Sequence, residues 1–199
     1  MVPNKIIAIL TFTLIFFSNI TKVYSIEADI FIQSIVNRAA ETLSAEITKD
    51  ERIEKLKDIA RETVDIDGIG RYTLGSYKNN ITDKQMKRYK SLFREYFLKT
   101  FSSRLAEYSN PEIEVVSKKK LNANYTMVSS ILVSTEQRPE VKIDWRVSTK
   151  NPDNLLIMNL IIEGLSLART QREEFSSIIN SNNGSINALL ANLEDFITK

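Results

Sequence analysis

The sequence predicts an α+β domain in which helices pack on one face of an antiparallel twisted sheet of about four strands and enclose an apolar cavity. Helical spacing of apolar residues covers both ends of the chain, whereas residues 112–162 alternate with a period of two. Turn residues at 137–139 and 151–154 leave connections too short for crossover helices, so the strands should form a meander. No repeat or linker divides residues 26–199, which we expect to form a single domain.

The first 25 residues, MVPNKIIAILTFTLIFFSNITKVYS, have the layout of a secretory signal peptide. Lys5 precedes an apolar run from Ile6 to Phe17, and Val23 and Ser25 suit cleavage after Ser25. An uncleaved anchor is the alternative, but a span needs about 20 apolar residues and this run is shorter. We therefore expect residues 1–25 to direct export and to be removed.

The charge of the remaining chain argues against nucleic acid as a partner. The 27 basic residues include Lys5 and Lys22, so the exported chain has as many basic as acidic residues. Nucleic acid binding requires a concentrated basic surface. The one basic run, 118–120, is predicted to be a solvated strand end or turn.

The absence of cysteine and histidine excludes several kinds of chemistry. Without cysteine the chain has no disulfide, no zinc-thiolate site and no thiol nucleophile. Without histidine it lacks the Ser-His-Asp arrangement and the commonest metal ligand. We therefore do not expect an enzyme.

The elements before the sheet are predicted to be helices over 26–47, 49–64 and 83–108. In the third, Thr82 and Gln85 form a capping box at its start. Its apolar stripe is aromatic and could be either core or the wall of a cavity; it contains Tyr89, Phe93, Phe97, Phe101 and Leu105.

Strands are predicted over 112–117, 125–135, 141–147 and 155–162. The third alternates cleanly, with apolar residues on one face and charged residues on the other. The fourth is apolar on nearly both faces, so we expect it to be central in the sheet.

Two helices are predicted after the sheet. The first covers 170–180 and stops at Asn183-Gly184, and Ser185 caps the second.

The stretch DIDGIGRYTLG, residues 65–75, holds three of the five glycines. It is not a nucleotide loop, because no strand precedes it and no Lys-Ser/Thr pair follows. Asp65 and Asp67 could form an acid pair for metal binding or acid–base work, but we favour Asp67 as the cap of a short helix ending at Leu74. Gly70 would permit close backbone packing.

The segment GLSLARTQR, residues 164–172, is predicted to be a turn from the last strand into a helix. Ser166 has no histidine to activate it and no G-x-S-x-G context. Arg169 and Arg172 could pair with acids or lie near an anionic headgroup.

Several of these segments together resemble the MlaC family of periplasmic phospholipid-binding proteins of Gram-negative bacteria. They are the leader, DIDGIGRYTLGSY, ITDKQMKRYKSLFREYF, PEVKIDWRV and IIEGLSLARTQREEFSSII, in the family's order. The residues that match the family pattern are Leu74, Gly75, Tyr77, Glu163, Gly164, Leu165, Ser166, Arg172 and Phe175. The chain departs from it at Val64 and Ile66, where a phenylalanine is usual, and at Leu155 or Leu156, where a tryptophan is usual.

The resemblance implies a phospholipid carrier that shuttles between an outer-membrane lipoprotein complex and an inner-membrane ABC transporter complex, and so maintains outer-membrane lipid asymmetry. It implies a periplasmic location, no cofactor and energy supplied by the transporter's ATPase. The acyl chains would lie between sheet and helices.

From alternation and stripes, the expected wall of the cavity is apolar, and the expected headgroup contacts are Arg169 and Arg172. The wall residues are Ile69, Leu74, Tyr77, Phe93, Phe97, Trp145, Val147, Leu160, Ile162, Leu165 and Leu167. Two alternatives remain from the sequence. One is a small-ligand enzyme of a cone-shaped α+β fold that uses Asp65, Asp67 or Tyr72, and the other is a secreted interaction module with a filled core.

Overall fold

The computed structural model describes residues 27–136 and 138–199, so the expected signal peptide lies outside the described residues. The predicted α+β class is confirmed. The helices are α1 (Ala28–Ser44), α2 (Lys49–Thr63), α3 (Ile66–Thr73), the 3₁₀ helix η1 (Gly75–Asn79), α4 (Asp83–Leu105), α5 (Leu167–Ser181) and α6 (Ile186–Thr198). The strands are β1 (Ile113–Asn122), β2 (Tyr125–Leu132), β3 (Val141–Ser148), β4 (Leu156–Ile162) and β5 (Leu165–Ser166).

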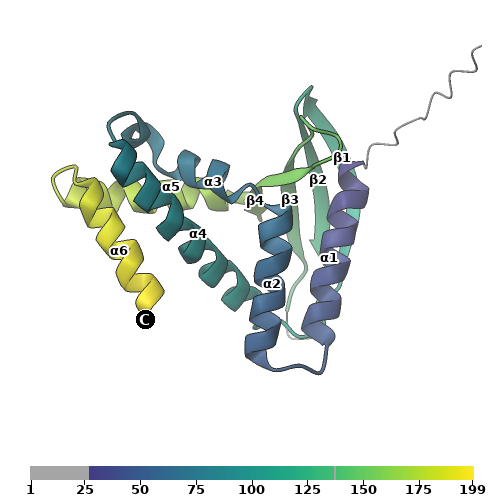
Figure 1. Ribbon diagram of the computed structural model, residues 1–199. Helices are drawn as coiled ribbons and strands as arrows, with labels where there is room; N and C mark the ends of the chain where they lie inside the picture. Colours follow the sequence, from purple (N-terminus) through teal and green to yellow (C-terminus); the bar gives the residue numbers. More distant parts are fainter. Residues whose placement is uncertain (1–26, 137) are drawn as a thin grey trace, which may run out of the picture.

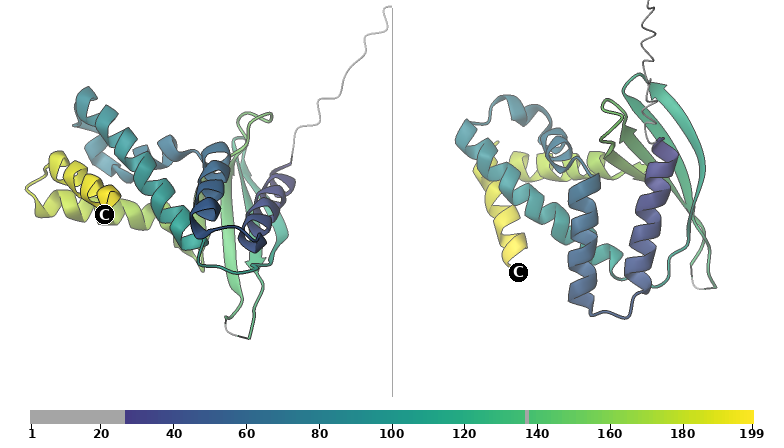
Figure 2. Two further views of the ribbon diagram at one scale, coloured as in Figure 1. Left: turned by 60° about the horizontal axis from the view of Figure 1, so that its bottom comes forward. Right: turned by 45° about the vertical axis from the view of Figure 1, so that its right-hand side comes forward.

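The sheet is an antiparallel meander in the order β1-β2-β3-β4-β5, as the short connections predicted. It has five strands instead of four, because β4 turns back through Gly164 into the two-residue β5. α1 and α2 lie side by side against one face of this sheet, and α3 to α6 form a second, helical lobe (Figures 1 and 2). Among the described helices, none combines the length and apolarity needed to cross a bilayer.

The prediction that the last long strand is central is wrong, since only β5 follows β4 in the sheet. The two-residue β5 leaves most of the outer edge of β4 without a strand partner. The backbone at Asp65 meets that edge, where Asp65 N donates to Ile157 O at 3.0 Å. α3 and α5 also pack against β4. Its apolar character therefore agrees with helices that pack against it, although only Ile157 is fully buried.

The helical lobe is organised by aromatic rings from α4 and α5. The Phe175 ring lies 6.1 Å from Phe93, 6.4 Å from Tyr89 and 5.8 Å from Tyr96, measured between centroids. Gly70 is needed beneath this cluster, because an added Cβ would lie 2.6 Å from the Phe93 ring. The close backbone packing predicted at Gly70 is thus confirmed.

Tyr89 makes the stability of this lobe sensitive to alkaline pH. Its hydroxyl meets Thr73 Oγ1 at 2.7 Å and donates to Gly70 O at 3.0 Å, and burial raises the pKa of the phenol above its usual value of about 10. Since the folded pKa exceeds the unfolded one, the neutral phenol stabilises the fold below pH about 10, and this stabilisation is lost as the pH rises further. Urea unfolding between pH 8 and 11 should show a falling free energy of unfolding above pH about 10. The decline should be shallower for Tyr89→Phe, and equal slopes for both proteins would contradict this assignment.

The start of α3 corrects one sequence prediction. Asp65, and not Asp67, is the N-cap: its Oδ1 accepts a hydrogen bond from Gly68 N at 2.9 Å. Asp67 lies in the first turn and pairs with Arg94 at 2.7 Å on the surface. The helix begins two residues earlier than the second acid suggested, because the chain leaves its contact with β4 at Asp65.

We expect Asp65→Ala to lower the free energy of unfolding by about 1 kcal/mol, the usual effect of losing an N-cap acceptor. Asp67→Asn removes only an exposed ion pair and should lower it by well under 1 kcal/mol. Urea denaturation of the two variants makes the comparison. A larger loss for Asp67→Asn would show that the surface pair, and not the cap, holds α3.

Other boundaries shift by a few residues. β1 runs to Asn122 and not to 117, so the basic run 118–120 lies within a strand, and β2 ends at Leu132 and not at 135. α5 begins at Leu167 and not at 170, because Ser166 caps it by accepting from Arg169 N at 3.3 Å. α4 ends at Leu105, before the expected end at 108. The predicted stop at Asn183-Gly184 is confirmed, and Gly184 N donates to Ile179 O at 2.9 Å.

Candidate functional site

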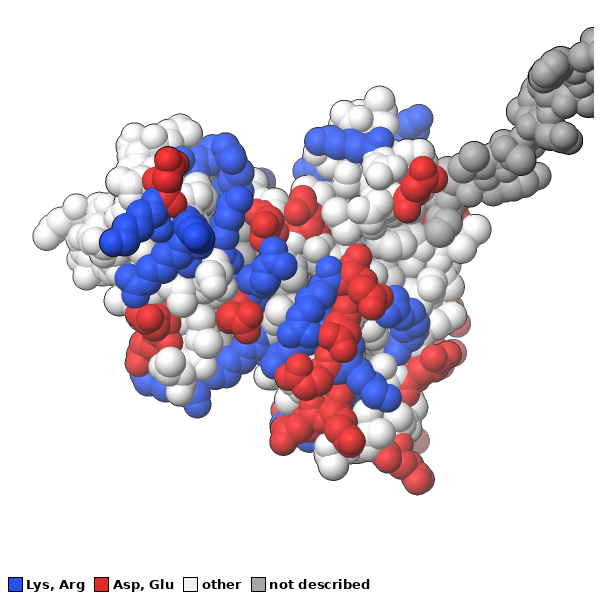
Figure 3. Space-filling view, viewed as in Figure 1, with Lys and Arg blue, Asp and Glu red and all other residues white. Residues whose placement is uncertain are grey.

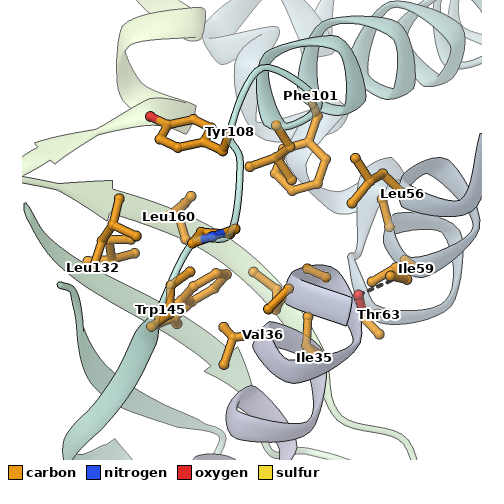
Figure 4. A pocket seen from close by; sticks show the side chains of 18 of the residues that line it. Ile35, Val36, Leu56, Ile59, Thr63, Phe101, Tyr108, Leu132, Trp145 and Leu160 are labelled. Carbon is orange, nitrogen blue, oxygen red and sulfur yellow. Dashed lines mark hydrogen bonds between the residues drawn. The ribbon is translucent and has the colours of Figure 1, made fainter. Parts of the chain in front are cut away.

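An apolar cavity lies between the sheet, α1, α2 and the C-terminal end of α4 (Figure 4). Its helical wall is formed by Ile35, Val36, Ala39, Ala40, Leu43, Leu56, Ile59, Ala60, Thr63, Val64, Phe101 and Leu105. Tyr108, Pro111 and residues of the first four strands complete it: Ile113, Leu132, Val141, Ile143, Trp145, Ile157, Leu160 and Ile162.

The cavity has a volume of about 150 Å³, which is large for a protein interior. An apolar space costs stability when it is left empty, at roughly 24 cal/mol per Å³ where it is enclosed. A filled core would avoid that cost. The interior is therefore not the filled core that the interaction-module alternative requires.

The polar atoms beside the cavity are occupied by other partners. Thr63 Oγ1 donates to Ile59 O at 2.7 Å, the bond drawn in Figure 4. Trp145 Nε1 donates to Ser130 Oγ at 2.8 Å, and Ser130 Oγ in turn donates to Ile143 O at 3.3 Å. The inner part of the wall thus presents hydrocarbon and ring surface, which suits an apolar ligand.

Three of the residues expected in the wall, Trp145, Leu160 and Ile162, line this cavity. The other eight lie elsewhere. Ile69, Leu74, Phe93 and Val147 are buried in the adjoining core, and Tyr77 and Phe97 pack against it. Leu165 and Leu167 are 58% and 40% exposed at the β5 hairpin and the start of α5.

Neither arginine expected near a headgroup lines the cavity. The Arg172 guanidinium lies 5.5 Å from the Tyr72 ring centroid, and its Nε would lie 2.8 Å from a Cβ at Gly75. Arg169 is exposed on α5. The helix to which both belong packs on α3 and β4, on the far side from α1 and α2.

The residues of the enzyme alternative do not converge on the cavity. Asp65 caps α3, Asp67 pairs with Arg94, and Tyr72 lies under Arg172. Among residues 27–136 and 138–199, no group of three acidic side chains is placed to hold a metal ion.

Sequence reasoning missed the helical wall on α1 and α2. In α1 the helical spacing of apolar residues from Ile35 to Leu43 indicates a buried face, and in α2 Leu56 and Ala60 indicate another. The small side chains Ala39, Ala40 and Ala60 on those faces were the available signal, because alanines beside bulky residues leave space.

Charge is unevenly distributed around the site. α4 carries seven basic residues and two acidic ones, and acidic side chains gather over α2 (Figure 3). From this basic helix only Phe101 and Leu105 line the cavity, so the wall itself stays apolar.

This architecture is similar to that of a known phospholipid-binding protein. A solved structure of a phospholipid-binding protein from Ralstonia solanacearum, in complex with a phospholipid, has the same fold with a TM-score of 0.72. The alignment covers 87% of this chain and all of that one, at 18% sequence identity. No curated protein sequence matches significantly. The family model described as MlaC protein matches residues 33–195, so the chain belongs to the MlaC family.

Proposed function

We propose that this protein is a periplasmic phospholipid carrier whose acyl-chain site is the cavity between the sheet and helices α1, α2 and α4. The observation that supports it most is the cavity itself, lined by apolar side chains whose few polar neighbours are already hydrogen-bonded. Membership of the MlaC family and the likeness to a phospholipid-bound structure favour the same ligand. They also favour a binding protein over an enzyme.

The energetics explain why such a carrier is needed. Two acyl chains of about fifteen methylenes each cost on the order of 24 kcal/mol to expose, at roughly 0.8 kcal/mol per methylene. A lipid therefore does not cross an aqueous compartment alone at a useful rate. An apolar site removes most of that cost without any covalent chemistry or bound nucleotide.

The site must widen to hold two full chains, because binding pockets even for drug-sized molecules are about 300–1,000 Å³. The packing indicates where this occurs. Leu43, Leu56 and Ala106 form a small cluster, separate from the main core, at the end where α1 and α2 meet α4. We infer that this small cluster opens, since separating a few side chains costs less than disrupting the main core.

We base the proposed transport role on membership of the MlaC family. The carrier would exchange lipid with an outer-membrane lipoprotein complex and an inner-membrane ABC transporter complex, and so maintain outer-membrane lipid asymmetry. Cleavage after Ser25 would release it into the periplasm. N-terminal sequencing of protein recovered by osmotic shock tests that cleavage directly, and protein found only in the cytosol would contradict it.

Lipid extraction tests the ligand. Organic extraction of the purified full chain followed by mass spectrometry should yield close to one glycerophospholipid per protein. The protein should also accept a labelled phospholipid from vesicles after delipidation. Protein that carries no lipid and takes none up would refute the proposed function.

A further inference from the structure

We propose that Arg138 is the phosphate contact of the bound lipid, held at the mouth of the cavity by the ring of Tyr108. The inference rests on the proposed lipid-binding function and adds the residue that distinguishes a phospholipid from a neutral lipid. The chemical class recognised is a phosphodiester attached to acyl chains.

Tyr108 marks the mouth. It is 38% exposed, whereas the other large residues of the wall are buried or half-buried. Val36 and Ile59, which line the cavity from α1 and α2, are both buried. A lipid with its chains inside would therefore have its headgroup beside Tyr108 (Figure 4).

Arg138 is not part of the cavity wall, but it is held against Tyr108, which is. Its guanidinium carbon lies 5.4 Å from the centroid of the Tyr108 ring, and its Nη2 donates to Val133 O at 3.3 Å. Its backbone is anchored by a bridge with Thr135, in which Thr135 N donates to Arg138 O at 2.8 Å. An arginine that stacks on an aromatic ring is already oriented, so it loses little entropy when it binds an anion.

The guanidinium has unused donors and no carboxylate partner. Its Nε is buried without a hydrogen-bond acceptor in the described part of the chain, and none of the ion pairs found there includes Arg138. By contrast Lys49 and Arg38 are paired with Glu107 and Glu62. The two Nη atoms of the guanidinium carry four N–H donors and Val133 O accepts from one of them, so a phosphate would be bound through the others.

Arg138 therefore has both a position beside the cavity and a positive charge that no carboxylate neutralises. The chains of a phospholipid would contact the apolar wall, and the phosphate would lie where the wall ends, against a guanidinium that matches two phosphate oxygens. Arg169 and Arg172 lack this placement because they lie away from the cavity.

The experiment compares two lipids that differ only in the headgroup. Delipidated full-length protein is titrated with a fluorescent phosphatidylethanolamine and with the diacylglycerol that carries the same labelled chains. For Arg138→Gln we expect about tenfold weaker binding of the phospholipid and unchanged binding of the diacylglycerol. Arg138→Lys should recover part of the preference, and the matched control Arg169→Gln should behave as the unsubstituted protein.

The outcomes separate the two proposals. If the unsubstituted protein binds neither lipid, the carrier function itself is refuted. If it binds both, and Arg138→Gln keeps its preference for phospholipid or loses both lipids equally, the phosphate role of Arg138 is overturned while the carrier function stands. Millimolar inorganic phosphate should not displace the lipid, and displacement would assign the site to free phosphate instead.

Discussion

Ala39→Phe is expected to abolish lipid loading while leaving the fold at least as stable. Ala39 lies on α1, where it lines the cavity and, like Leu105, packs against the small cluster that contains Leu43. A phenyl ring at this position would occupy space that the acyl chains need. Filling a void also recovers part of its cost, which is roughly 24 cal/mol per Å³. We expect bound lipid after extraction to fall at least tenfold, with an unfolding midpoint equal to or above that of the parent protein.

Ala191→Phe is the matched control, because Ala191 is exposed on α6 and does not line the cavity. It should retain full lipid occupancy. The combination of unchanged stability and lost binding is specific to a ligand site, since a substitution that merely damages the core lowers both. Lipid occupancy of Ala39→Phe equal to that of Ala191→Phe would mean that the acyl chains lie elsewhere.

Phe175→Ala is expected to have the largest effect on stability. The side chain is 2% exposed, and its ring contacts three others in the helical lobe. Removal of a buried phenyl ring costs about 3–5 kcal/mol in free energy of unfolding. Phe196→Ala is the control, because that ring is 41% exposed although it lies 4.9 Å from Tyr96, and it should cost less than half as much.

Phe175→Ala also tests whether the packing of the helical lobe affects lipid binding in the cavity. α5 contributes nothing to the wall of the cavity. Below the onset of unfolding in urea, Phe175→Ala should therefore bind the labelled phospholipid within about twofold of the parent protein. A parallel loss of affinity would show that the helical lobe is coupled to the cavity more tightly than the packing indicates.

The secondary structure was largely predictable because it depends on local patterns. The period of four from Tyr89 to Phe101 indicated a helix, and the alternation from Val141 to Val147 indicated a half-buried strand. The place of β4 in the sheet was not predictable in this way. Apolar residues on both faces of a strand indicate that other elements cover it, but they do not give its position in the sheet. Here α3 and α5 pack against β4.

The wall of the cavity was only partly predictable for a related reason. A stripe reports which face of a helix is buried, but not what it is buried against. On α4 one continuous stripe serves two purposes: Tyr89 and Phe93 fill the helical lobe, whereas Phe101 lines the cavity. On α1 and α2 the buried faces were identified, but a void and a packed core produce the same pattern.

By itself, the sequence determined the α+β class and the antiparallel meander, and it shows that the chain lacks the histidine and cysteine that many catalytic and metal sites require. Those properties follow from the composition and from the spacing of apolar residues, which is a local pattern within each helix or strand. Only the tertiary structure decided that a cavity remains between the sheet and helices α1, α2 and α4, and that Arg138 meets Tyr108 beside it. Both depend on contacts between residues distant in the chain, and no local pattern specifies such distances.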